Sequence, residues 1–212
     1  SDRVQVGLIV AASGTCARGP APATRSEPDL TTIHISEAEL AERAGRIAML
    51  LLDVDGVLTD GGIYVDADGR DLKRFHVADG SGIKYFQRVG REVALLSGRS
   101  SPAVTARAAE LGIARVFQNA KAKEPVYERI LADAGLTDSQ VAVMGDDLPD
   151  LPLLRRAGLA IAPANAAEPV QAAADVVTAA DGGRGAVREA VEMLLKSAGL
   201  WDRIMARYVE GT

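Results

Sequence analysis

Cysteine, aromatic residues, positive net charge and long apolar runs are scarce or absent in this sequence. The single cysteine, Cys16, excludes an internal disulfide and predicts a reducing, cytoplasmic location. No apolar run approaches the roughly 20 residues that a membrane-spanning helix needs, so no membrane partner is expected. The net charge of −5 argues against a general nucleic-acid surface, so no nucleic-acid partner is expected either.

Composition and local patterns divide the 212 residues into a leader, one domain and a final helix. Residues 1–35 are rich in Ala, Gly, Pro, Ser and Thr without a period, which predicts a mobile leader. Ser36 followed by Glu39 is a capping-box pattern, so a helix is expected directly after it. The domain is expected to span residues 36–200, and the last helix to lie in residues 201–212.

Helical and strand patterns alternate through the domain. The expected helices are 37–44, 81–89, 102–111, 124–134, 150–157, 168–174, 186–198 and 201–208. The expected strands are 48–52, 92–96, 114–117, 141–144, 159–161 and 176–177. This alternation predicts an α/β fold with a doubly wound, Rossmann-like parallel sheet. Residues 62–77 predict a protruding β-hairpin, because two alternating arms flank the turn signal Asp68-Gly69.

Two carboxylates, Asp53 and Asp55, follow the apolar strand at 48–52. In extended chain, residues i and i+2 point the same way, so the two side chains can converge. They would do so at the carboxyl end of the strand, where open α/β sheets bind their ligands. Taken alone, such a pair is more often a polar exit from a strand than a catalytic site.

Three further polar clusters follow later strands of the expected sheet. Ser97-Gly98-Arg99 offers a hydroxyl, a glycine N–H and a helix start, which can hold a phosphate, although most such tripeptides are plain turns. Lys123 stands near a helix start, where a lone lysine is usually a solvated charge. The segment 145–150, Gly-Asp-Asp-Leu-Pro-Asp, suits either helix capping or Mg²⁺.

Taken in order, the four clusters resemble the four motifs of the haloacid dehalogenase superfamily, whose members are mostly phosphatases. The string Asp-Val-Asp-Gly-Val-Leu-Thr, which starts at Asp53, is the most specific of them. The resemblance implies a haloacid dehalogenase-like fold without a cap domain, because the gaps that hold caps in other members are short here. It implies Asp53 as the nucleophile and Asp55 as the general acid and base.

The resemblance also implies Mg²⁺ as cofactor, held by Asp53, the backbone carbonyl of Asp55, and Asp146. Such an ion would offset the repulsion between the nucleophile and the phosphate. Two further groups are implied around it. Ser97 and Lys123 would hold the phosphoryl oxygens. Asp147 and Asp150 would orient Lys123 and the metal-bound waters.

A narrower resemblance rests on three segments. The hairpin at 62–77, the string 75–83 and the string 182–189 (Gly-Gly-Arg-Gly-Ala-Val-Arg-Glu) are similar to 3-deoxy-D-manno-octulosonate 8-phosphate (KDO 8-phosphate) phosphatases. The similarity spans about residues 39–198. It implies hydrolysis of this sugar-acid phosphate in lipopolysaccharide biosynthesis. It also implies a homotetramer in which the hairpins of four subunits form a central barrel.

The same resemblance implies where the substrate binds. Besides Asp55 and Lys123, the implied contacts are His76, Val77, Ala78, Asp79, Gly80, Lys84, Gly98, Arg99 and Arg107. Ala78 departs from the pattern, because relatives often carry a basic residue there. Arg99 favours the eight-carbon sugar, since relatives that act on nine-carbon acids have Gly-Glu at this point. Arg184 is expected to bind the carboxylate of a substrate held by a neighbouring subunit.

Two alternatives stay open. One is a phosphatase for another sugar acid, such as a nonulosonate (sialic-type) 9-phosphate. The other is a non-catalytic oligomerisation module, because domains of this type are fused to some cytidylyltransferases. The complete set of catalytic residue types argues against lost chemistry, and phosphate release from a generic aryl phosphate separates the two classes.

Overall fold

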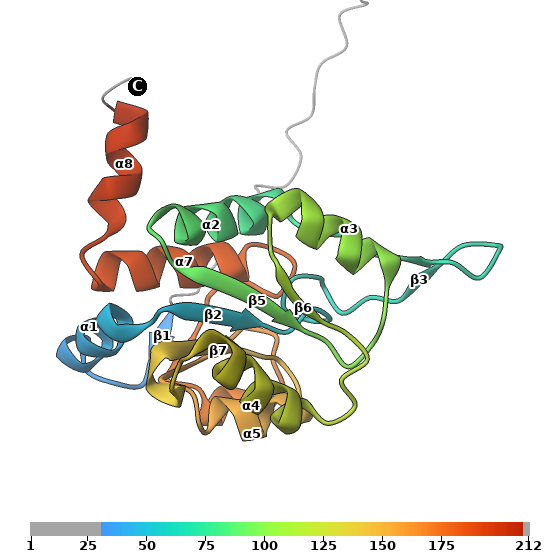
Figure 1. Ribbon diagram of the computed structural model, residues 1–212, viewed down its shortest axis with the longest axis horizontal. Helices are drawn as coiled ribbons and strands as arrows, with labels where there is room; N and C mark the ends of the chain where they lie inside the picture. Colours follow the sequence, from blue (N-terminus) through green and yellow to red (C-terminus); the bar gives the residue numbers. More distant parts are fainter. Residues whose placement is uncertain (1–30, 210–212) are drawn as a thin grey trace, which may run out of the picture.

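The computed structural model describes residues 31–209 and is built around a seven-stranded sheet (Figure 1). Its strand order is β1-β9-β8-β7-β2-β5-β6. The strands are β1 (Thr32–Ile33), β2 (Met49–Leu52), β5 (Glu92–Leu96), β6 (Arg115–Phe117), β7 (Val141–Met144), β8 (Leu159–Ala162) and β9 (Val176–Val177). All neighbours pair in parallel except β1, which runs antiparallel to β9. The predicted doubly wound α/β fold is confirmed.

Strand β1 corrects one boundary. The sequence analysis assigned Thr32 and Ile33 to the leader, whereas they form an edge strand whose backbone pairs with Val176 and Val177. Two residues are too few to carry a periodic pattern, so only the distant partner reveals this strand. The rest of the predicted leader, residues 1–30, lies outside the described residues, and its mobility stays a prediction.

Helices cover both faces of the sheet (Figure 1). One face carries α1 (Glu37–Arg46), α2 (Val77–Arg88), α3 (Pro102–Leu111) and α7 (Ala186–Ser197), and the other carries α4 (Lys123–Ala134), α5 (Leu151–Leu154) and α6 (Glu168–Ala173). Strand β2 shows why each face is covered. Its side chains alternate, so Leu50 and Leu52 pack into the hydrophobic core on the first face, and Met49 and Leu51 pack into the core on the second. The last helix is α8 (Trp201–Val209). Within residues 31–209, no helix has the length and apolar character needed to cross a membrane.

Helix α2 begins at Val77, four residues before the predicted start at 81. The prediction was wrong because two glycines in this segment resemble a loop. Both are used for close packing instead. A Cβ on Gly80 would overlap the guanidinium of Arg107, and a Cβ on Gly82 would lie 3.0 Å from the Cα of Arg188. Glycine therefore lets α2 lie against α3 and α7 rather than ending the helix.

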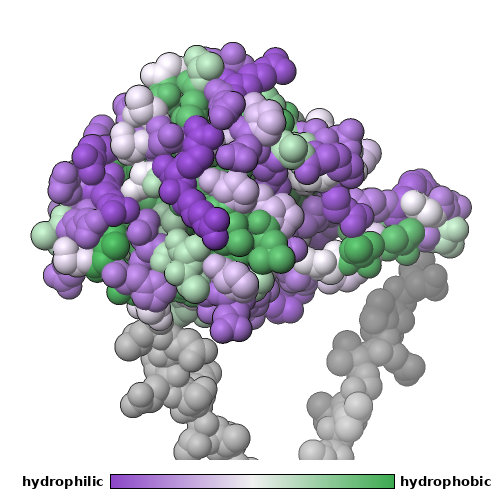
Figure 2. Space-filling model, turned by 90° about the horizontal axis from the view of Figure 1, so that it is seen from below, coloured by the Kyte–Doolittle hydropathy of each residue, from purple (hydrophilic) through white to green (hydrophobic). Residues whose placement is uncertain are grey.

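The predicted hairpin is present, as strands β3 (Tyr64–Val65) and β4 (Asp71–Leu72). It ends sooner than predicted, because Val77 belongs to α2. Its turn contains Gly69 at φ +78°, and the Asp66 carboxylate accepts the N–H groups of Asp68 and Arg70. The hairpin projects from the body with apolar side chains on its surface (Figure 2). The most exposed of these are Ile63, Val65 and Leu72.

Candidate active site

The structure brings the four polar clusters together at the carboxyl edge of the sheet. Asp53 follows β2, Ser97 follows β5, Lys123 opens α4 and Asp146 follows β7. A cavity of about 290 Å³ lies at this edge. It is lined by Asp53, Asp55, Gly98, Arg99, Ala120, Lys121, Lys123, Asp146, Asp147, Pro149 and Asp150.

Lys123 joins two carboxylates that come from different segments, Asp53 after β2 and Asp150 in the turn that follows β7. Its Nζ lies 2.6 Å from Oδ1 of Asp53 and 2.6 Å from Oδ1 of Asp150. All three side chains are buried, so each charge depends on the others for compensation. Burial alone would lower the pKa of Lys123, but the two carboxylates outweigh it and hold that pKa above its usual value. Lys123 is therefore a fixed ammonium within the cluster, not a solvated surface charge.

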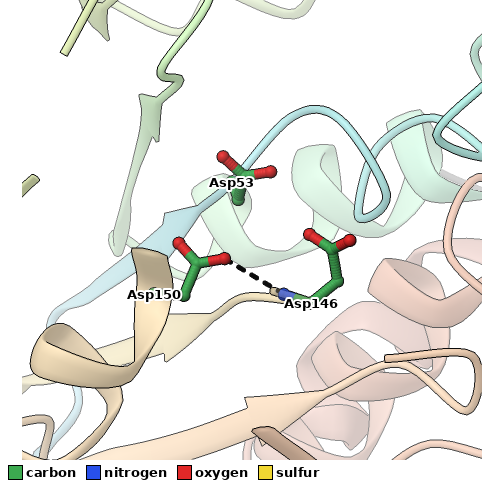
Figure 3. Close-up of side chains that lie close together, drawn as sticks. All are labelled: Asp53, Asp146 and Asp150. Atoms are coloured by element: carbon green, nitrogen blue, oxygen red, sulfur yellow. Dashed lines mark hydrogen bonds between the residues drawn. The ribbon is translucent and has the colours of Figure 1, made fainter. Parts of the chain in front are cut away.

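Asp150 fixes the loop after β7. Its Oδ2 accepts the backbone N–H of Asp146 at 3.2 Å (Figure 3) and that of Asp147 at 3.4 Å. Gly145 permits this contact, because a Cβ there would overlap the Asp150 side chain. The predicted helix 150–157 is replaced by a 3-10 turn, Leu148–Asp150, and the short α5. Prolines 149 and 152 can only stand near helix starts, which explains why the segment divides.

Asp53 and Asp146 form an electrostatically crowded pair. Burial raises the pKa of Asp53 to about 6, against the opposing effect of Lys123. Burial, together with the charges of Asp53 and Asp150, raises the pKa of Asp146 to about 7. Oxygens of these three aspartates lie within 4.8 Å of one another. Both oxygens of Asp150 are engaged, one by Lys123 and the other by backbone N–H groups, whereas Lys123 pairs with only one oxygen of Asp53. Asp53 and Asp146 are therefore the carboxylates best placed to hold a cation. An all-oxygen set fits the predicted Mg²⁺.

The loop after β2 is shaped around this pair. Gly56 has φ +96°, a conformation that favours glycine, and a Cβ there would overlap the carboxylate of Asp146. The buried hydroxyl of Thr59 accepts the N–H groups of Gly56 and Gly61 and donates to the carbonyl of Val54. Gly56 and Thr59 therefore hold the backbone of this loop close to Asp146.

The two oxygens of Asp55 meet different groups. Ser97 Oγ lies 3.5 Å from Oδ2 of Asp55 and also accepts the N–H of Arg99. Oδ1 forms an ion pair with Lys73, which lies just after β4 at the base of the hairpin. The sequence analysis missed Lys73, because a lysine in a hairpin arm reads as a solvated charge. It also missed Lys121, which lines the cavity.

Not every predicted substrate contact reaches this cavity. Val77, Gly80, Lys84 and Arg107 line a separate cavity of about 320 Å³ between α2 and α3. Lys84 donates to the carbonyl of Leu111 at 2.5 Å. This cavity and the cavity at the acid cluster have no lining residue in common. Within one subunit, the structure does not bring them to the same ligand.

The segment around α2 has a structural task as well. Asp79 is buried, and its carboxylate accepts the N–H groups of Gly185 and Arg188, at 3.3 and 2.9 Å. It therefore caps the start of α7 and does not line the cavity. Nδ1 of His76 is buried without a hydrogen-bond partner among the described residues. Ala78 also lies outside the cavity lining.

Three further predicted residues line the cavity, and a fourth does not. Gly98 and Arg99 line the cavity. Asp147 lines it too, although its Oδ1 accepts the N–H of Leu148 and so caps the turn. Arg184 lies outside the lining, with a largely exposed side chain 4.0 Å from Asp60 Oδ2.

A parallel sheet with this acid pair, serine, lysine and acid cluster at its carboxyl edge defines a haloacid dehalogenase-like hydrolase. The sequence model of the haloacid dehalogenase-like hydrolase family matches residues 104–190. The KDO 8-phosphate phosphatases KdsC of Escherichia coli K12 and Haemophilus influenzae are both 41% identical to the chain, over 165 and 160 residues. The alignments cover 78% and 76% of this chain and 88% and 89% of the relatives. The chain belongs to the KDO 8-phosphate phosphatase family, as the motifs predicted.

A solved structure supports the same assignment. The KDO 8-phosphate phosphatase of Moraxella catarrhalis, in complex with magnesium, phosphate and KDO, superposes with a TM-score of 0.78 at 38% identity. The superposition covers 80% of this chain and 98% of that one. Fold, motifs and relatives thus agree on a phosphoric monoester hydrolase.

Proposed function

We propose that this protein hydrolyses KDO 8-phosphate to KDO and inorganic phosphate with Mg²⁺, as a step of lipopolysaccharide biosynthesis. The observation that carries the proposal is the contact of Lys123 with both Asp53 and Asp150 beside Asp146. A buried ammonium and a cation site beside the carboxylate of Asp53 provide what an aspartate nucleophile needs to approach a dianionic phosphate.

Asp53 is the proposed nucleophile. One of its oxygens attacks phosphorus in line, and the bond between phosphorus and the sugar oxygen breaks as an aspartyl-phosphate forms. Asp55 gives its proton to the departing sugar oxygen. It then takes a proton from water, whose oxygen attacks phosphorus, releases phosphate and restores the Asp53 carboxylate. One carboxyl group thus serves as acid and then as base.

The remaining groups bind the metal ion and stabilise the negative charge of the phosphoryl group. Asp53, Asp146 and the backbone carbonyl of Asp55 would hold Mg²⁺, which supplies positive charge beside the transferring phosphoryl group. The Ser97 hydroxyl and the N–H of Gly98 would donate to phosphoryl oxygens, and Lys123 would pair with a third. Asp150 keeps Lys123 in place, and Asp147 shapes the turn that presents Asp146.

A single subunit provides only part of the predicted binding site for the sugar. Arg99 lines the cavity and is the proposed contact for the eight-carbon acid. Lys84 and Arg107 line a different cavity, so a contact with the same substrate requires a neighbouring subunit. The apolar hairpin surface supports a homotetramer with shared sites. A role for residues 76–80 and Arg184 in such a site stays a prediction, and so does the cytoplasmic location.

Phosphate release tests the proposed function. The protein with Mg²⁺ is given KDO 8-phosphate, a nonulosonate 9-phosphate and an aryl phosphate, and kcat/KM is compared. The highest value is expected for the eight-carbon acid. A higher value for the nine-carbon acid would replace the substrate but keep the chemistry. No release from any of the three would leave the oligomerisation module as the better reading.

A further inference from the structure

Lys73 is a buried cation at the base of the hairpin. Its side chain is 3% exposed, although the hairpin around it projects into solvent. Its ammonium pairs with Oδ1 of Asp55, and the next carboxylate, Oδ2 of Asp71, lies 3.7 Å away. A buried ammonium is costly unless it is paired, so the Asp55 contact decides where this side chain lies.

The two oxygens of the Asp55 carboxyl group have different partners. Oδ1 is held by Lys73, whereas Oδ2 faces the hydroxyl of Ser97. Asp55 lines the cavity but Lys73 does not. Lys73 therefore reaches the reaction only through Asp55, from outside the space where a substrate would lie.

We propose that Lys73 is a positioning residue, which holds Oδ1 of Asp55 so that Oδ2 carries the proton delivered to the departing sugar oxygen. The inference rests on the proposed function. In the first step, the O–H bond at Oδ2 breaks, the proton goes to the ester oxygen, and the electron pair of the broken P–O bond stays on that oxygen. Without Lys73 the carboxyl group can rotate, and a proton on it is less often directed at the leaving oxygen.

The hairpin gives this contact a second consequence. Lys73 follows directly after Leu72, which is more than half exposed on the apolar surface of the hairpin. In the proposed homotetramer, a second copy of this chain that packs on this surface would fix the hairpin, and with it the ammonium that orients Asp55. Assembly and the orientation of the acid would then be coupled through one residue.

The test compares wild-type protein with Lys73→Met, which removes the charge while nearly keeping the length. The matched control is Arg70→Met, which removes an exposed hairpin cation whose partners are Asp66 and Asp68. With Mg²⁺, kcat/KM is measured for KDO 8-phosphate and for aryl phosphates of rising leaving-group pKa. This constant reports the first step, in which the leaving oxygen is protonated.

For Lys73→Met we expect kcat/KM to fall about ten- to a hundredfold on KDO 8-phosphate, part of what an acid catalyst supplies. It should fall less than about threefold on the most acidic aryl phosphate, because a good leaving group needs little protonation. The plot of log kcat/KM against leaving-group pKa should become steeper. Arg70→Met should keep the wild-type slope.

Equal losses on all substrates, with an unchanged slope, would mean that Lys73 only supports the fold of the site and would overturn the inference. So would an unchanged rate on KDO 8-phosphate. If Lys73→Met does not fold by circular dichroism, Lys73→Gln carries the same comparison. Failure of the proposed function is separate, because wild-type protein would then release no phosphate from these substrates.

Discussion

Gly182 lies directly against the backbone carbonyl of Gly56, so closely that a Cβ on Gly182 would overlap that oxygen. The contact is held by hydrogen bonds on both sides. The N–H of Gly182 donates to Asn165 Oδ1 at 2.9 Å, and the N–H of Gly183 donates to the carbonyl of Val57 at 2.8 Å. The glycine-rich turn before α7 thus supports the loop that follows Asp53.

Gly182→Ala should therefore impair both folding and activity. The added methyl group must displace the backbone of Gly56, and with it the approach of this loop to Asp146. We expect a loss of stability of about 1–3 kcal/mol, as for overpacked sites, and a fall in kcat. Gly45→Ala is the control, because it meets no atom within 4 Å in α1 and should stabilise the helix by about 1 kcal/mol. Thermal unfolding and phosphate release measure both effects.

Arg184 projects from the same turn and tests recognition of the substrate's carboxylate. Arg184→Ala should lower kcat/KM for KDO 8-phosphate by about ten- to a hundredfold, since a charged hydrogen bond contributes roughly 1.5–3 kcal/mol. An aryl phosphate without a carboxylate should be little affected. Hybrids of Arg184→Ala and Asp53→Asn subunits should recover activity if the arginine serves a neighbouring site. Equal losses on both substrates, or inactive hybrids, would contradict this role.

Asp53→Asn should abolish turnover while leaving the fold intact, because an amide of nearly the same shape cannot act as an anionic nucleophile. A residual rate above about a hundredth of wild type would exclude aspartyl catalysis; that factor corresponds to about 2.7 kcal/mol of barrier. Circular dichroism checks the fold. Asp55→Asn should be similarly impaired on alkyl phosphates.

Metal binding should depend on pH with a definite sign. The pKa of Asp53 is raised to about 6 and that of Asp146 to about 7, both above the usual 3.8. The folded metal-free protein thus binds these protons more tightly than the unfolded chain, and its stability falls as pH rises from about 4 to about 7. Mg²⁺ requires the ionised carboxylates, so its affinity should rise over the same range.

Thermal unfolding at pH 5.5 and pH 8, with Mg²⁺ or with EDTA, measures this dependence. The Mg²⁺-induced rise in Tm should be larger at pH 8, and EDTA should stop phosphate release until Mg²⁺ is restored. Asp146→Asn should remove most of the Mg²⁺ effect. Full activity in excess chelator, or equal Tm shifts at both pH values, would contradict the cation site assigned to Asp53 and Asp146.

The hairpin should determine the oligomeric state. Ile63 and Val65 are 65% and 61% exposed on a piece too small to bury them alone. Light scattering at micromolar concentration should give a tetramer for wild-type protein and smaller species for Val65→Asp. Ala132→Asp places the same charge on an exposed position of α4 and should leave the tetramer unchanged. A wild-type monomer would remove the claim and the shared site with it.

Local patterns in the sequence predicted much of the sheet and the polar residues at its carboxyl edge. The strands at β5 and β7 and helix α3 have the predicted bounds, because apolar runs, a proline at a helix start and Gly112 at a helix end are local signals. Asp53 and Ser97 stand directly after strands, and Asp146 stands one residue further on. Parallel strands end at one edge of a sheet, so their meeting there could be predicted without knowing any distance.

The tertiary structure decided what local pattern could not. Lys73 and Asp55 are 18 residues apart, and Asp79 and Arg188 are 109 apart, so neither contact leaves a periodic trace in the chain. Gly80 and Gly82 read as helix breakers until α3 and α7 are seen to pack on them. The sequence determined which chemical groups are available and on which edge they stand. Packing between distant segments decided which of them touch, because the energy of a buried contact depends on neighbours that the local sequence does not specify.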